Sequence, residues 1–255
     1  STPRLAADRY GKQPSPKPLT TTAPPSSVVA PGTDITPLFR AAYENRYTWE
    51  PGFGGYKGRC VWEQGNRREE GRFVVGADLK ASVEGIDDAE ITKAMASQLW
   101  EVCIHRVRRT FEQTHSANTF SAGDTDAVGL EVIVGGKGSG DRYRIKDDVV
   151  TMVHRHIHGT VVTIFTLATT DTGAGYLSRR YSSVYSDPAT GAARGGTSHF
   201  TDTFVPLAGT GPWVLSERVI AADAGSDEAS SSEEAGGEAA GAGEQRFRFE
   251  DLQPL

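Results

Sequence analysis

Three histidines at alternate positions, His154, His156 and His158, are the first residues of the chain whose spacing could support chemistry. They lie in a β-branched run over 149–158 that predicts a strand. Successive side chains of a strand point to opposite faces. The three imidazoles are therefore expected on one face, with Arg155 on the other.

This histidine strip fits three kinds of site, and the residues alone do not choose among them. It could supply two or three ligands to zinc or iron, with His105, His199 or a carboxylate completing the coordination. Three consecutive imidazoles of one face cannot all bind one tetrahedral ion without strain, however, and interspersed arginines repel a cation. The strip could instead form a pH-sensitive polar surface or hydrogen-bond to a neighbouring element.

Basic residues form the second candidate site, beginning with the run His105 to Arg109 at the end of a predicted helix. Such a run could bind an anion or a partner, or it could simply complement the negative end of the helix dipole. Partner interfaces use arginine as an anchor. Residues assigned here to partner binding are His105, Arg106, Arg108, Arg109, Arg142, Arg144, Arg155, Arg179 and Arg180.

Catalytic motifs are missing from the chain. It contains no Gly-x-Ser-x-Gly, His-Glu-x-x-His or Cys-x-x-Cys sequence, so hydrolase and redox functions have no motif in their support. The glycine-rich segment Gly135–Gly140 lacks Walker A spacing and lies between two predicted strands, which favours a flexible hairpin. We therefore expect a protein that is not an enzyme and uses no cofactor.

The elements that must position these residues are mostly strands. Periodicity predicts a short first helix over 33–46 and one long helix over 88–111. Strands are expected at 56–64, 67–75, 78–84, 128–134, 141–147, 149–158, 160–170, 176–186, 197–205, 212–221 and 245–252. The fold class that follows is α+β, with a strongly curved antiparallel β-meander, open and barrel-like, wrapped around the long helix.

The long helix has an unusually wide apolar surface. Ile91, Met95, Leu99 and Val102 form one stripe. A wide apolar arc indicates a helix covered on more than one side. The adjacent stripe consists of Trp100, Ile104, Val107 and Phe111.

Composition divides the chain into one folded part and two polar segments. Residues 1–32 hold seven of the thirteen prolines, and residues 222–244 are rich in Ala, Gly, Ser and acids. Neither segment can bury enough apolar surface to fold, so we expect a single domain over 33–255, preceded by a disordered leader and interrupted by a disordered acidic insertion. The near-neutral remainder argues against nucleic-acid binding, and no apolar run is long enough for a transmembrane segment. The two cysteines, Cys60 and Cys103, suggest no disulfide framework.

Four long motifs resemble the DUF3386 family of cyanobacteria and chloroplasts. They occupy residues 38–49, 98–109, 154–163 and 171–178, in order, within a similarity that covers about 34–221 and the final strand. The resemblance implies no reaction or ligand. It implies a setting in oxygenic phototrophs, hence the chloroplast stroma or the stromal face of the thylakoid membrane, and the leader would suit a protein imported into the organelle.

Two functions of different class follow. The first is a non-enzymatic accessory protein that docks on photosystem II or another thylakoid complex and acts in its assembly or repair, an expectation that rests on the family's setting. The second is a carrier of a small apolar ligand between the curved sheet and the helix, or a histidine-dependent metal-binding protein.

Overall fold

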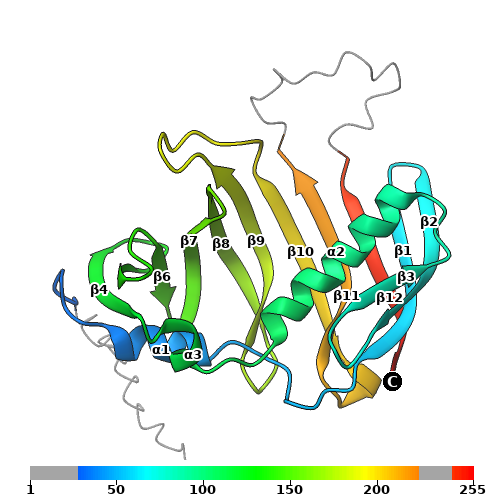
Figure 1. The fold of residues 1–255 in the computed structure, drawn as a ribbon, viewed down its shortest axis with the longest axis horizontal. Helices are drawn as coiled ribbons and strands as arrows, with labels where there is room; N and C mark the ends of the chain where they lie inside the picture. Colours follow the sequence, from blue (N-terminus) through cyan, green and yellow to red (C-terminus); the bar gives the residue numbers. More distant parts are fainter. Residues whose placement is uncertain (1–27, 224–242) are drawn as a thin grey trace, which may run out of the picture.

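Twelve strands form one open antiparallel sheet in the computed structural model, which describes residues 28–223 and 243–255 (Figure 1). The spatial order is β3-β2-β1-β12-β11-β10-β9-β8-β7-β6-β5-β4. Strands that follow one another in the chain are paired, except that β3 and β4 form the two edges, and β12 closes the order by pairing with β1 as well as β11. The predicted open, antiparallel meander is confirmed. The strands are β1 Tyr56–Gln64, β2 Arg67–Val75, β3 Ala81–Glu84, β4 Asn118–Thr125, β5 Leu130–Gly136, β6 Arg142–Lys146, β7 Val149–Ile157, β8 Thr160–Asp171, β9 Tyr176–Ser186, β10 Ser198–Pro206, β11 Trp213–Ala222 and β12 Gln245–Pro254.

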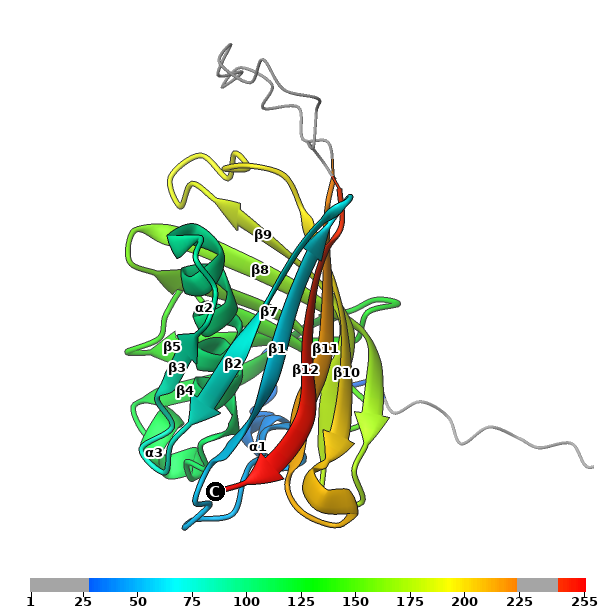
Figure 2. The same ribbon diagram turned by 90° about the vertical axis from the view of Figure 1, so that its right-hand side faces the viewer.

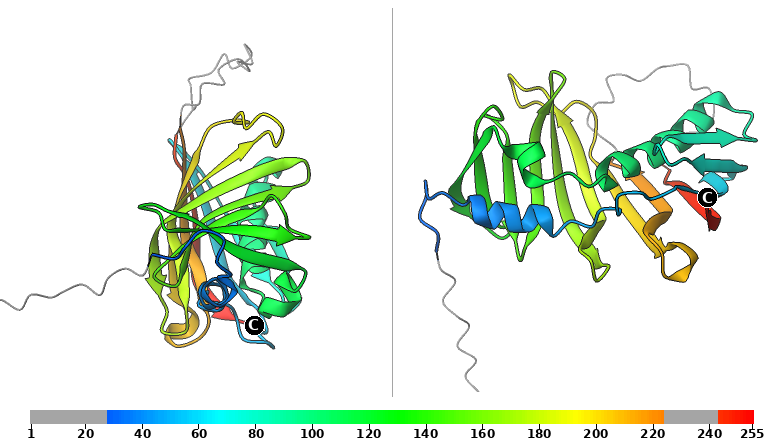
Figure 3. Two further views of the ribbon diagram at one scale, coloured as in Figure 1. Left: turned by 90° about the vertical axis from the view of Figure 1, so that its left-hand side faces the viewer. Right: turned by 60° about the horizontal axis from the view of Figure 1, so that its bottom comes forward.

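The helices of the described residues all lie on the concave side of the sheet, apart from a short 3-10 turn, η1 (Leu207–Gly209), after β10 (Figures 2 and 3). They are α1 (Thr36–Glu44), α2 (Ala89–Arg106) and α3 (Phe111–His115). In this part of the chain no helix combines the length and the apolarity needed to cross a bilayer.

The single long helix expected over 88–111 is not what the structure has. The first helix of this region ends at Arg106, and Val107 then takes an extended conformation. Thr110 begins a separate helix, since its side chain accepts a hydrogen bond from the amide of Gln113, whose own side chain accepts from the amide of Thr110. This capping box favours a new helix over continuation of α2. It provides hydrogen-bond acceptors for backbone amides that would otherwise need partners within a longer helix.

Helix α2 is covered on one side only. It begins at Asp88, whose Oδ1 accepts from the amides of Glu90 and Ile91. Its predicted inner stripe of Ile91, Met95, Leu99 and Val102 is buried. The second predicted stripe is not, because Trp100 is 57% exposed and Ile104 is 42% exposed. The expectation of a helix covered on more than one side is therefore wrong.

Two separate apolar cores hold the helices to the sheet. One lies under α2 and includes Trp62, Phe73 and Phe247. The other lies under α1 and α3 and includes Phe39 and Phe120. Helix α2 packs mainly on β1 and β3, and α1 on β4 and β7. The concave side of β8 and β9 lies between the two helices (Figure 1).

The edge strand β4 was not predicted, because Phe120 and Ala122 are its only buried apolar residues. Residues 28–35 run beside this edge: the amide of Gly32 donates to Ala122 at 2.8 Å and that of Ile35 to Phe120 at 3.1 Å. Residues 28–32 of the predicted leader therefore belong to the fold. The rest of that leader, 1–27, and residues 224–242 of the predicted insertion lie outside the described residues.

Candidate functional site on the concave face

Strand register identifies which side chains share the face that carries the helices. Arg218 of β11 faces α2, because its guanidinium bonds to the side chain of Gln98 at 2.9 Å and to the hydroxyl of Tyr181 on β9 at 2.9 Å. Tyr185 lies four residues beyond Tyr181 on the same strand, with no bulge between them, and so shares this face. Tyr185 pairs with Val162 on β8, and Val162 pairs with Arg155 on β7, which places Arg155 on the helix-bearing face.

Arg218 is the best-buried charge of the described residues and ties α2 to the sheet. It is 2% exposed and forms a two-pronged ion pair with Asp202, with both nitrogen–oxygen distances at 2.9 Å. Glu101 of α2 lies 3.3 Å from the same guanidinium. The hydroxyl of Tyr181 completes the network by donating to Asp202 at 3.0 Å. These contacts supply a counter-charge and hydrogen-bond acceptors to a buried cation, so we interpret the network as structural.

His105 projects from the same flank of α2 as the two residues that contact Arg218, since it follows Gln98 by seven positions and Glu101 by four. Its side chain is accessible to water, yet protein surrounds it closely enough to lower its pKa to about 4. Burial is the main cause, and the charges of Arg106, Arg46, Arg218 and Arg155 lower the pKa further. We call these four arginines the arginine cluster. They come from four different elements and act on one imidazole, which stays neutral at pH 7.

Of the nine basic residues predicted to bind a partner, His105 and Arg106 are adjacent at the end of α2, and Arg155 is the third, because its charge acts on the His105 imidazole. The other six lie elsewhere, and several are already paired. Arg142 and Arg144 lie on the opposite, convex face, because they pair with His154 and Met152 in the register. Arg142 pairs with Glu131, and Arg144 pairs with Asp124, Asp126 and Glu131. Arg108 pairs with Glu50, and Arg179 donates to the carbonyl of Thr169. Arg180 lies on β9, and Arg109 follows the end of α2.

The histidine strip is divided. His154 and His156 share the convex face as predicted, with Arg155 on the other face. His158 does not belong to the strand, because β7 ends at Ile157 and His158 adopts a left-handed turn conformation with φ 48°. His154 Nδ1 lies 3.2 Å from the Thr163 hydroxyl, and His156 Nδ1 lies 3.0 Å from a carboxylate oxygen of Asp141.

These contacts account for the two strand histidines as a hydrogen-bonded strip, one of the alternatives left open by the sequence. Their ring centroids are 6.0 Å apart. Within residues 28–223 and 243–255, no three His, Cys, Asp or Glu side chains are grouped so as to hold a metal ion.

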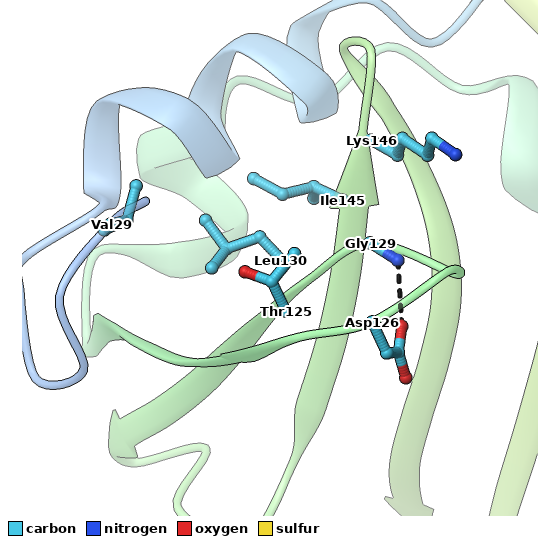
Figure 4. A pocket seen from close by; sticks show the side chains of 7 residues that line it. All are labelled: Val29, Thr125, Asp126, Gly129, Leu130, Ile145 and Lys146. Carbon is cyan, nitrogen blue, oxygen red and sulfur yellow. Dashed lines mark hydrogen bonds between the residues drawn. The ribbon is translucent and has the colours of Figure 1, made fainter. Parts of the chain in front are cut away.

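The described residues also form two small pockets, the second of which is lined in part by Arg46 of the arginine cluster. The first, of about 220 Å³, lies between the N-terminal segment and strands β4 to β6 and is lined by residues such as Leu130 and Asp126 (Figure 4). Its carboxylate is already engaged, because Asp126 accepts from the amides of Val128 and Gly129 and pairs with Arg144 at 3.3 Å.

The second pocket, of about 250 Å³, lies beside α1 and includes Arg108 and Arg109. Its arginines also face acids, since Arg40 pairs with Glu44 and Glu112. Arg46 and Arg109 also line this pocket, and neither has an acidic partner among the described residues.

The fold and the site define a class: an open antiparallel sheet whose concave side carries helices at both ends and a cluster of arginines between them. The chain belongs to the family described as "Protein of unknown function (DUF3386)", whose model matches residues 30–254. No curated protein matches the chain. A crystal structure from Vibrio parahaemolyticus, described as an outer membrane lipoprotein-sorting protein domain, is similar over 86% of this chain and 91% of that one, at 8% identity and a TM-score of 0.26.

Proposed function

We propose that the protein is a non-enzymatic carrier that binds a small apolar ligand on the concave side of β7, β8 and β9, between α1 and α2. The observation that supports this is the apolar floor, which we define as Ile157, Ile164 and Tyr185. Ile157 is 39% exposed, Tyr185 is 54% exposed and Ile164 is half-buried. All three share the face of Arg155, by alternation and by the pairing of Ile164 with Val153.

Exposed apolar side chains that gather in one concave region are typical of ligand sites, whereas scattered ones need no explanation. The convex face offers a contrast. Its exposed apolar residues lie on strands that are not adjacent, with Ile133 on β5 and with Phe165 and Leu167 two positions apart on β8. The apolar floor is instead formed by three adjacent strands.

Two measurements test the carrier function. Mass spectrometry of organic extracts from protein purified under native conditions should find an apolar compound at close to one per chain. Displacement of a fluorescent naphthalene dye should then give a binding curve that the double variant Ile157→Ser, Tyr185→Ser weakens about tenfold or more. Phe165→Ser is the matched control, because Phe165 follows Ile164 on β8 but points to the convex face. No extracted compound and no dye binding would refute the proposal.

A second candidate is the accessory role on a thylakoid complex such as photosystem II, in a chloroplast setting. Its support from the fold is the outer face of α2, where Trp100 and Ile104 are exposed one helical turn apart. Aromatic and aliphatic anchors of this kind contribute most to protein interfaces. A pull-down from gently solubilised thylakoids should retain a membrane complex that Trp100→Ala loses and Lys57→Ala, on β1 away from α2, keeps. Recovery of no complex at low salt would refute this role.

A further inference from the structure

Arg155 lies beside the apolar floor, and its positive charge has no acidic partner among the described residues. It is exposed, and within the described residues no carboxylate, carbonyl or hydroxyl bonds to its guanidinium. Arg142 and Arg144, on the neighbouring strand but on the opposite face, both pair with carboxylates. An arginine left without an acid among neighbours that are paired is available to an external anion.

Arg106 adds a second cation without an acidic partner. It is the last residue of α2, and its guanidinium lies over the ring of Phe204 at 5.2 Å. Its Nε is fully buried and has no hydrogen-bond partner among the described residues. A buried donor without a partner is costly, and an anion reaching this end of α2 would relieve part of that cost.

Arg46 completes the set from the segment after α1. Its guanidinium lies 4.0 Å from the ring centroid of Tyr43, and its Nε donates to the carbonyl of the same residue at 3.0 Å. These contacts fix the side chain through its ring face and one nitrogen, so its charge is positioned but not neutralised.

The charges of this region do not balance. The arginine cluster contains four guanidinium groups, while the carboxylates that act on it are Asp202 and Glu101, both bound to Arg218. His105 adds no compensating charge. The remaining positive charge lies on Arg46, Arg106 and Arg155, and the register places Arg155 between Ile157 and Ile164 of the apolar floor.

We propose that the ligand of the concave face is an anionic amphiphile, with a carboxylate or phosphate head bound by Arg155 in the positive field of Arg106 and Arg46. Its apolar tail lies along Ile157 and Tyr185. The inference rests on the proposed carrier function and adds the chemical class of the ligand. Guanidinium groups bind oxyanions of both kinds through paired N–H donors, so the shared chemistry is an oxyanion on an apolar chain. Arg155 and Ile157 are two residues apart on one strand face, which places head and tail in direct succession.

Three probes with the same alkyl chain separate head from tail: dodecanoate, dodecyl phosphate and dodecanol. Isothermal titration with the full chain should show at least one of the anions binding about tenfold or more tightly than the alcohol. Comparison of the two anions shows whether the head is a carboxylate or a phosphate. Arg155→Gln should weaken the anion about tenfold, equivalent to about 1.4 kcal/mol, and leave dodecanol binding unchanged. Arg142→Gln is the control, because this arginine lies on the convex face of the adjacent strand.

The outcomes distinguish the two proposals. Failure of all three probes to bind would refute the carrier function and, with it, the anionic head. Equal binding of the anions and the alcohol, unaffected by Arg155→Gln, would leave the carrier function intact and refute the anionic head. A loss of dodecanol binding in Arg155→Gln would assign Arg155 a structural role and would also refute it. Arg106→Gln provides a second variant with the same expected pattern, and circular dichroism confirms that each variant is folded.

Discussion

Replacement of Asp202 by asparagine should destabilise the protein by about 3 kcal/mol, because it leaves Arg218 buried without its main counter-charge. The pair is almost inaccessible to water, at 2% and 4% exposure, and its two bonds are both 2.9 Å long. Removing one partner of a buried ion pair costs about 3–5 kcal/mol. We expect the lower end of this range, since Gln98, Tyr181 and Glu101 still bond to the guanidinium.

Urea unfolding followed by tryptophan fluorescence measures this loss. With a slope of about 2 kcal/mol per molar urea, the midpoint should fall by about 1.5 M. The matched control is Glu63→Gln, which removes the carboxylate that Arg248 contacts at 2.9 Å on a partly exposed part of the sheet. Exposed pairs contribute about 0–1 kcal/mol, so this variant should stay close to the parent protein.

A double variant tests whether the unpaired charge is the cause. Asp202→Leu combined with Arg218→Met removes both charges, and its loss of stability should be smaller than the sum of the two single losses by about 2–3 kcal/mol. Additive losses, or a cost below about 1 kcal/mol for Asp202→Asn, would refute the interpretation of Arg218 as a buried, paired cation that holds α2 in place.

Three further predictions concern other parts of the fold. Burial, followed by the charges of Arg155 and Arg46, lowers the pKa of His115 to about 4. As the pH falls below about 6.5, the histidine therefore becomes protonated in the unfolded chain before it does in the folded protein. Between pH 7 and pH 5, the free energy of unfolding in urea should fall by about 2 kcal/mol more for the parent than for His115→Gln. Burial raises the pKa of both Cys60 and Cys103 to about 11, so Ellman's reagent at pH 8 should label them only as fast as the protein unfolds, and immediate labelling would contradict this. Gly175 has φ +119°, and a Cβ there would lie 2.7 Å from the carbonyl oxygen of Asn45. Gly175→Ala should therefore reduce the free energy of unfolding by about 2 kcal/mol and lower the thermal midpoint by several degrees, a clearly larger fall than that caused by the nearby Gly173→Ala.

The strands were predictable because their signals are local. Alternating β-branched residues and glycine turns placed eleven of the twelve strands within a few residues of where the structure has them. The twelfth, Asn118–Thr125, carries few apolar residues and depends on the N-terminal segment for pairing. The end of α2 was mispredicted for a similar reason: Phe111 continues the apolar spacing of the helix, yet it packs in the other core beneath α1.

The candidate site was predictable only in part. Strand alternation correctly separated Arg155 and Ile157 from His154 and His156, since the period of two needs no tertiary information. The assembly of Arg46, Arg106 and Arg155 was not predictable, because they come from three elements that only the curvature of the sheet brings together. Arg46 and Arg218 were missed altogether.

Arg218 in particular lies in a strand where charged and apolar residues do not alternate. Glu217 precedes it and Val219 follows it, and a bulge at Thr203 shifts the register of the neighbouring strand. Without the register, nothing in the sequence separates this buried arginine from the exposed ones.

An arginine without an acid beside exposed apolar side chains is the physical reason to regard the concave face as a binding site. Arginines that are largely buried in the sheet are paired with acids, as Arg218 is with Asp202 and Arg144 is with Asp124. Arg155, Arg106 and Arg46 receive none among the described residues, although uncompensated like charges near one another raise the free energy of the folded state. Arg72, Arg109, Arg179 and Arg180 also lack an acidic partner in the described part of the chain, so the absence of an acid alone does not mark a site. Arg155 differs because it lies two residues from the exposed Ile157 on one strand face, which suits a ligand that brings both a negative charge and an apolar surface.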